Sequence, residues 1–229
     1  MYRDAMGTLL IAVVPLAIGA AVSPTLLALQ LLVLTGPTDR LPRAWALAGG
    51  SALVLAAFSI LGFTVLVKLH PDHHGHGSFR DALIMFVAGG LLGLLALRSL
   101  LHRPTTGEQQ KSRMAGRLDT APTSWFLVMG AIGMVVNFST LLLFLPALHE
   151  ITRSAVGVFG RATAFAVLYL VTLLPVLVPV GLVTILGPRA DPALDATHSF
   201  VTRNSRRIGL VIEVVFAIYL VGKGVRELP

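Results

Sequence analysis

Six long apolar runs constrain this chain more than any other feature. They cover residues 7–34, 44–67, 82–101, 125–148, 162–186 and 208–225. A helix that crosses a bilayer needs about 20 mainly apolar residues, so each run is long enough to span a membrane. Only 13% of the 229 residues are charged, whereas about 25% is usual in soluble domains. The pattern predicts an all-α integral membrane protein with six transmembrane helices in one domain, residues 1–229.

The distribution of Lys and Arg predicts the orientation of these spans. Eleven of the 18 basic residues lie in or beside the connections 1–2, 3–4 and 5–6, and seven lie on the opposite side. Basic residues are enriched in cytoplasmic loops. We therefore expect a multi-pass protein of the inner (plasma) membrane with both termini outside. Membrane topology also explains the net charge of +7, so we expect no nucleic-acid partner.

The first and fourth runs resemble each other. A shift of 114 residues places residues 12–34 on residues 126–148, with nine of 23 positions identical, among them Ala-Ile-Gly at 17–19 and 131–133. Three spans per half is an odd number, so the second half would enter the membrane in the opposite orientation. The sequence thus predicts two inverted three-helix repeats, about residues 7–101 and 125–229, joined by a cytoplasmic linker at about 102–124. Secondary transporters are commonly built this way, with the substrate site at interrupted helices near the midplane.

The polar interruptions of these two runs align. Ser23-Pro24 falls on Asn137-Phe138. Proline removes a backbone donor and clashes with the preceding turn, and asparagine can bond the local backbone and cap a helix. An alternative is that the polar side chains only join helices, since proline is tolerated in membrane spans. Because the interruptions align, we predict a substrate site formed by Ser23, Pro24, Thr25, Asn137, Ser139 and Thr140.

Glu213 is the only acidic residue well inside a predicted span. A carboxylate at this depth is costly and usually faces the bundle interior or a water-filled cavity. One interpretation is that Glu213 couples transport to protons. The other is that it pairs with an arginine such as Arg206, or with a polar group of another helix. The sequence leaves both open, and Glu213 is the candidate coupling acid.

The fifth run contains Pro175 and Pro179, four residues apart. They remove two backbone donors and predict a kinked or broken helix. A gating hinge and a fixed bend are equally compatible with this pattern.

Four histidines between the second and third runs are potential metal ligands. His70, His73, His74 and His76 are of the type that binds zinc, nickel or copper. They lie in a polar connection whose glycines, Gly75 and Gly77, loosen any geometry, so we expect a solvated loop without a specific metal site and keep metal binding as the alternative. The chain has no cysteine, and we find no nucleotide-binding or catalytic motif. We therefore expect no cofactor and no enzymatic activity.

The order of several segments resembles a known family. These are AIGAAVSPTLLALQLLVLTGPTDRLPRAWALAGG, GGLLGLLALRSLLHRP, RMAGRLDTAPTSW and THSFVTRNSRRIGLVIEVVFAIYLVGKGVREL. Together they resemble the sulfolipid-addressing or glycopeptidolipid-addressing (GAP) protein family of actinobacteria, within the lysine-exporter (LysE) superfamily. The resemblance implies a LysE-like six-span fold and a role in exporting envelope lipids. One departure stands out, because the family usually has Asn-Pro-Lys where this chain has Asn137-Phe138-Ser139.

The sequence therefore predicts an inner-membrane secondary exporter or flippase-like translocator. Its substrate would be a cell-envelope lipid, a glycolipid or an amphipathic metabolite. Export of metal ions or amino acids, as in other branches of the superfamily, is the first alternative. A non-transporting scaffold that assists a lipid synthase or exporter is the second. Membrane lipids are the expected partners, and a lipid-synthesis or lipid-export protein and a homodimer are left open.

Overall fold

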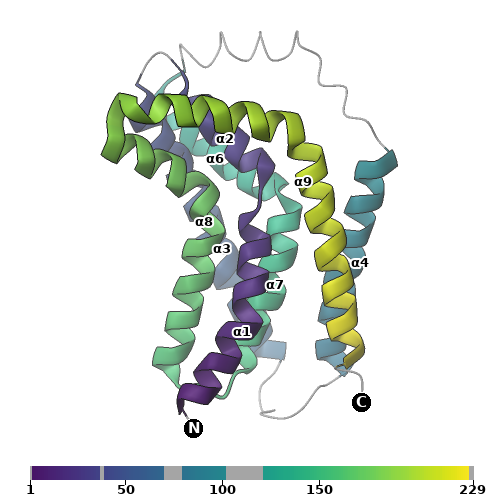
Figure 1. Ribbon diagram of the computed structural model, residues 1–229. Coiled ribbons are helices and arrows are strands. Elements are labelled where there is room, and N and C mark those ends of the chain that lie inside the picture. Colours follow the sequence, from purple (N-terminus) through teal and green to yellow (C-terminus); the bar gives the residue numbers. More distant parts are fainter. Residues whose placement is uncertain (1, 37–38, 70–78, 102–120, 227–229) are drawn as a thin grey trace.

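A computed structural model describes residues 2–36, 39–69, 79–101 and 121–226. Every regular element in these residues is a helix (Figure 1). In chain order the elements are α1 (Tyr2–Ala21), α2 (Pro24–Leu34), α3 (Arg40–Leu69), α4 (Phe79–Leu101), α6 (Thr123–Val136), α7 (Phe138–Arg153), α8 (Val158–Leu186), the 3₁₀ helix η1 (Gly187–Ala190) and α9 (Asp191–Arg226). The prediction of an all-helical chain is confirmed for this part of it.

Three helical stretches are long and apolar enough to cross a membrane. They are Arg40–Leu66, Leu83–Leu101 and Val158–Arg226, the last of which joins α8, η1 and α9. The bent pairs α1–α2 and α6–α7 raise the number to five if each pair is one span. The chain is thus a membrane protein with three to five candidate spans, and the sixth span stays a prediction.

Both predicted interruptions are breaks in the helices. α1 and α2 meet at 52°, and α6 and α7 meet at 69°. Pro24 is the first residue of α2, where its missing N–H costs no helical hydrogen bond, and the side chain of Ser23 accepts a hydrogen bond from the N–H of Leu26 at 3.3 Å. Asn137, at φ −80° and ψ 67°, separates α6 from α7. Local chemistry therefore explains the first break, whereas the side chain of Asn137 makes no capping hydrogen bond at the second.

The proline pair of the fifth run leaves α8 unbroken. Pro175 and Pro179 both lie inside the helix. Figure 1 shows that the upper part of α8 leans away from the bundle, as expected for a helix that has lost two backbone donors. Thr172 donates its hydroxyl to the carbonyl of Leu168 at 2.7 Å and so stays satisfied within the helix.

Residues 187–207, expected as a connection, are helical. η1 leads directly into α9, whose first part runs across one end of the bundle before the helix turns along α4 (Figure 1). Leu194 and Val201 are buried, whereas most of the residues between them are exposed. This spacing of seven residues puts both side chains on one helix face. Arg40 binds Asp191 at 2.7 Å and ties the start of α9 to the start of α3.

Two glycines allow α3 and α6 to cross with their backbones in contact. A β-carbon at Gly50 would collide with the carbonyl of Leu127, and one at Gly130 would collide with the carbonyl of Leu47. Ser51 donates its hydroxyl to the carbonyl of Gly130 at 3.1 Å at the same crossing. Small residues commonly permit such close approaches in membranes. Both termini lie at the other end of the bundle from the crossing part of α9 (Figure 1).

Candidate functional site

The two helix breaks meet each other. Asn137 donates its side-chain amide to the hydroxyl of Ser23 at 2.8 Å and to that of Thr140 at 2.6 Å. Thr140 donates in turn to the carbonyl of Ala20, at the end of α1, at 2.9 Å. Ser139 donates to the side-chain carbonyl of Asn137 at 3.2 Å. The structure thus brings four of the six predicted site residues into one hydrogen-bond network.

A cavity of about 410 Å³ lies beside this network, and we call it the polar cavity because four polar side chains contribute to its otherwise apolar lining. Thr25, Asn137 and Ser139 line it together with Glu213, which comes from α9. The remaining lining is apolar and includes Leu29, Leu95, Met129, Ile132, Gly133, Val136 and Phe138. The carboxyl group predicted to couple transport therefore shares one cavity with three predicted binding residues.

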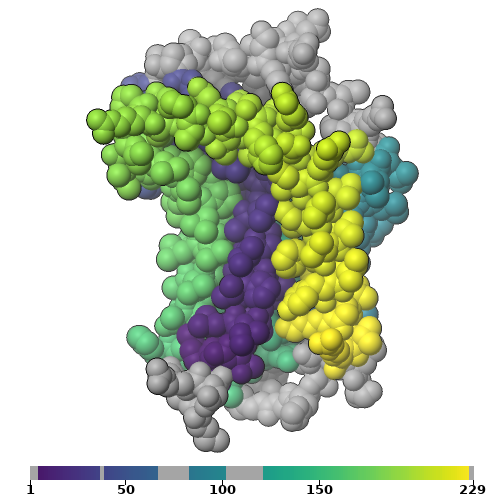
Figure 2. Space-filling model, viewed as in Figure 1, coloured from purple at the N-terminus to yellow at the C-terminus, as the bar shows by residue number. Residues whose placement is uncertain are grey.

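An apolar groove of about 530 Å³ lies at the same break. Ser23 and Pro24 line it at the junction of α1 and α2, and Pro175 and Pro179 line it from α8. The first part of α9 contributes Ala193, Leu194, Thr197, Phe200 and Val201. Figure 2 shows α1 between α8 and the descending part of α9, with the first part of α9 above them. Since Ser23 lines the groove and Asn137 lines the cavity, their hydrogen bond lies between the two spaces.

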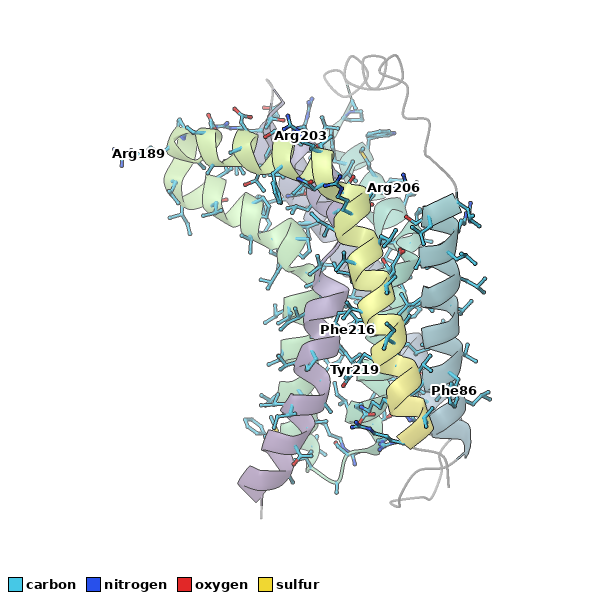
Figure 3. All side chains as sticks on the ribbon, turned by 45° about the vertical axis from the view of Figure 1, so that its right-hand side comes forward. Phe86, Arg189, Arg203, Arg206, Phe216 and Tyr219 are labelled. Carbon is cyan, nitrogen blue, oxygen red and sulfur yellow. The ribbon has the colours of Figure 1, made fainter. Side chains whose placement is uncertain are left out.

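Glu213 is half-buried, and its Oε2 atom is buried without a hydrogen-bond partner among the residues the structure describes. Arg206 donates instead to the carbonyls of Ser99 and Leu100 at 2.8 to 3.1 Å, which holds the end of α4 against α9 (Figure 3). One turn after Glu213, the ring of Phe216 fills the space where Gly19 of α1 has no side chain. The carboxyl group therefore faces the cavity with hydrogen-bonding capacity unused.

A buried charged group at the end of α7 was missed by the sequence analysis. The fourth run was expected to end at residue 148, but α7 continues to Arg153 and carries His149 and Glu150, which are 1% and 7% exposed. Lys223 of α9 binds Glu150 at 2.9 Å, and Arg153 lies 3.8 Å from it. The helix therefore continues past the expected end of the fourth run, and this buried extension carries a histidine and a second acid.

The apolar spacing contained a signal for this extension. Leu143, Ala147 and Ile151 recur at four-residue intervals, and all are buried. Such spacing indicates one continuous helix face. The charges after residue 148 indicate the end of a span when the sequence is considered alone, because their partner, Lys223, lies 73 positions away from Glu150.

The histidine tract at residues 70–76 lies outside the described residues, so its predicted behaviour stays untested. Within the ranges that the structure covers, no group of three or more His, Asp or Glu side chains could hold a metal ion.

The bent apolar helices meet through polar side chains. An apolar groove lies on one side of this contact, and the polar cavity lies on the other. These features define the class of this molecule. It is a multi-helix membrane protein with a polar centre. The chain belongs to the family described as Sap, sulfolipid-1-addressing protein, whose model matches residues 13–226. The predicted family resemblance is thereby confirmed, while membership of the LysE superfamily stays a prediction. Comparison with curated proteins and with solved structures finds no match.

Proposed function

We propose that this protein moves an envelope lipid or another amphipathic molecule across the inner membrane, as an exporter or a flippase-like translocator. Membership of a lipid-addressing family makes a lipid the favoured cargo. The observation that carries the proposal is the hydrogen bond between Ser23 and Asn137, which lies between an apolar groove and a polar cavity. An amphipathic molecule needs both kinds of surface.

The proposed architecture is six crossings in two inverted repeats. α3 and α4 are one crossing each, each bent pair is one, and α8 and the descending part of α9 are two. Two termini at one end of the bundle are compatible with an even number of crossings (Figure 1). A second sequence match supports the repeat, since α3 and α8 share the pattern Arg-Ala-x-Ala-x-Ala at residues 43–48 and 161–166. Each pattern begins at the fourth residue of its helix.

The proposed orientation places the termini outside and the first part of α9 at the cytoplasmic side. Arg189, Arg203 and Arg206 lie along that end of the bundle (Figure 3), and Arg40 lies there through its ion pair with Asp191. Basic residues favour the cytoplasmic face.

The cavity favours an uncharged polar headgroup. The amide donors of Asn137 are used by Ser23 and Thr140, but the hydroxyl oxygens of Thr25 and Ser139 can accept hydrogen bonds from a ligand. Glu213 is the one charged residue among those that line the cavity in the described chain. An anionic headgroup would meet the carboxyl group of Glu213 and no cation among the described residues of this cavity. At the position where relatives usually carry a lysine, this chain has Ser139. Hydroxyl-rich headgroups such as sugars therefore fit best.

The proposal is tested by lipid analysis of a deletion strain, with inner-membrane lipids separated from surface-extracted lipids. We expect the deletion strain to retain one lipid class in the inner membrane. Reintroducing the wild-type protein should restore this lipid to the surface, whereas reintroducing Asn137→Ala should not. The matched control is Asn204→Ala, which changes the chain's other asparagine, outside the break. An unchanged lipid distribution in the deletion strain would overturn the proposal.

A scaffold without transport activity predicts a different result. The purified protein would then fail to move fluorescent glycolipids between the leaflets of vesicles, although the deletion strain still retained the lipid. Co-purification with a lipid synthase or exporter would support that second interpretation.

A further inference from the structure

A crevice of about 460 Å³ lies between α3 and α8, apart from the helix breaks. Ile60, Phe63, Ile151 and Phe165 form most of its apolar wall, and Arg161 and Ala162 of α8 line it as well. It lies near the end of α3 and the start of α8, which is the end of the bundle where both termini lie (Figure 1). Its volume is within the range of about 300 to 1,000 Å³ that is usual for ligand sites.

Arg161 is the only cation among the residues that line this crevice in the described chain. One guanidinium nitrogen donates to the carbonyl of Ser154 at 2.7 Å, which fixes the side chain. Its Nε atom is buried without a hydrogen-bond partner in the part of the chain that the structure describes. The hydroxyls of Ser59 and Thr64 are used by carbonyls of their own helix, those of Leu55 and Ile60. The crevice thus has apolar walls and a single cationic group, and the terminal nitrogens of its guanidinium carry N–H donors beyond the one bonded to Ser154.

The equivalent arginine in the first half, Arg43, has an aromatic ring beside its guanidinium, which Arg161 lacks among the residues that the structure describes. Arg43 also begins the Arg-Ala-x-Ala-x-Ala pattern, but its guanidinium lies 5.1 Å from the ring centre of Phe126 and donates to the carbonyl of Ala121. The residue aligned with Phe126 by the 114-residue offset is Ala12, which has no ring to cover a guanidinium. The first arginine is covered by protein, and the second opens onto a crevice.

We propose that this crevice binds an anionic phospholipid from the leaflet at the end where the termini lie. Ile60 and Val158, which are 70% and 85% exposed, flank the opening and leave it accessible to the bilayer. An acyl chain would contact Ile60, Phe63 and Phe165, and the phosphate would accept hydrogen bonds from Arg161. Arginine binds phosphate through several donors at once and remains charged when it is partly desolvated. This site lies outside the polar cavity and does not depend on the transported molecule.

The test uses the full chain in nanodiscs of mixed phosphatidylglycerol and phosphatidylcholine. Native mass spectrometry counts the lipids that stay bound after the nanodisc is released. We expect about one retained phosphatidylglycerol, and a weakening of about tenfold in Arg161→Gln, the fold-change that corresponds to about 1.4 kcal/mol. Arg161→Lys should retain part of the preference for the anionic lipid. Arg203→Gln, at an exposed arginine on the other end, is the matched control and should bind as the wild type does.

A second variant keeps the test decisive if Arg161→Gln does not fold. Ala162→Phe fills the exposed crevice and leaves the hydrogen bond from Arg161 to Ser154 in place, so it should also lose the retained lipid. Equal retention of phosphatidylglycerol by Ala162→Phe and the wild type would overturn the proposal. Equal retention of phosphatidylglycerol and phosphatidylcholine by the wild type would also overturn the proposal. A second copy of the chain bound at the crevice in place of a lipid would overturn it as well.

Discussion

Asn137 and Ser23 are hydrogen-bonded at 2.8 Å, although 114 residues separate them. The same number is the offset that aligns the first apolar run with the fourth, so the two side chains occupy equivalent positions in the aligned runs. Equivalent residues of an inverted pair can touch only near the axis that relates the two halves. This contact places the axis of the proposed repeat at the helix breaks, between the groove and the cavity.

Replacing Asn137 should loosen the junction of the breaks. Asn137→Ala removes two donated hydrogen bonds and leaves the buried hydroxyl of Ser23 with fewer partners. We expect a loss of stability of about 1 to 3 kcal/mol, the usual cost of an unsatisfied buried polar group. Thermal unfolding in detergent measures the change. Asn204→Ala, at an asparagine that donates to the carbonyl of Phe200 in its own helix, should unfold as the wild type does. Equal melting temperatures for all three proteins would contradict the network.

Replacing Glu213 should uncouple transport from protons without unfolding the protein. Glu213→Gln keeps the size and hydrogen-bonding capacity of the side chain but cannot lose a proton in this range of pH. We expect lipid movement in vesicles that no longer responds to an imposed pH gradient. Asp195→Asn, at an exposed acid of α9, is the matched control and should leave the response unchanged. A full response in Glu213→Gln would remove this residue from the coupling step.

Alanine substitutions at two adjacent glycines of the α3–α6 crossing should differ in their effect on stability. Gly50→Ala places a β-carbon against the carbonyl of Leu127, whereas Gly49→Ala meets no atom within 4 Å. We expect Gly50→Ala to lose about 1 to 3 kcal/mol, as overpacked positions do. Gly49→Ala should be neutral or slightly stabilising, because alanine favours helix more than glycine. The fraction of folded protein at increasing denaturant compares them, and identical curves would be inconsistent with backbone contact at this crossing.

The ion pair between Lys223 and Glu150 should show strong coupling. Lys223→Met removes the cation at 2.9 Å from the buried carboxylate of Glu150 and leaves Arg153 at 3.8 Å, and we expect a loss of about 3 kcal/mol, the low end for a broken buried pair. Adding Glu150→Gln should restore much of this loss. A double-mutant cycle gives the coupling energy, and Arg226→Met, at an exposed residue of α9, serves as the control. Additive effects of the two changes would show that the pair contributes nothing.

The first helix break could be predicted because its cause is local, since Pro24 cannot donate a backbone hydrogen bond in any tertiary setting. The second break was predicted from the tendency of asparagine to bond the local backbone, but the side chain of Asn137 makes no capping bond and donates to Ser23 and Thr140. The alignment of the two breaks then predicted that residues from both would share a site, and the structure does bring Ser23, Asn137 and Thr140 together.

The limits of two helices could not be predicted because their causes are tertiary. Glu150 remains in a buried helix since Lys223 arrives from α9, and that partner cannot be inferred from spacing. Residues 191–207 look polar in sequence, but the helix buries Leu194 and Val201 on one face and exposes the charges on the other. A helix that lies across the end of a bundle needs only that narrow apolar face.

The glycine crossing of α3 and α6 also determines where the two halves of this chain can separate. Flexible side chains that could absorb sliding are missing where Gly50 and Gly130 bring the backbones together, so we expect the halves to rotate about this point. The largest displacement would then occur on the far side, where α2, α8 and α9 surround the apolar groove, and a lipid tail could enter sideways from the bilayer. Because the native chain has no cysteine, single disulfides can be introduced without background. One across α3 and α6 should leave transport intact, and one across α2 and α8 should stop it.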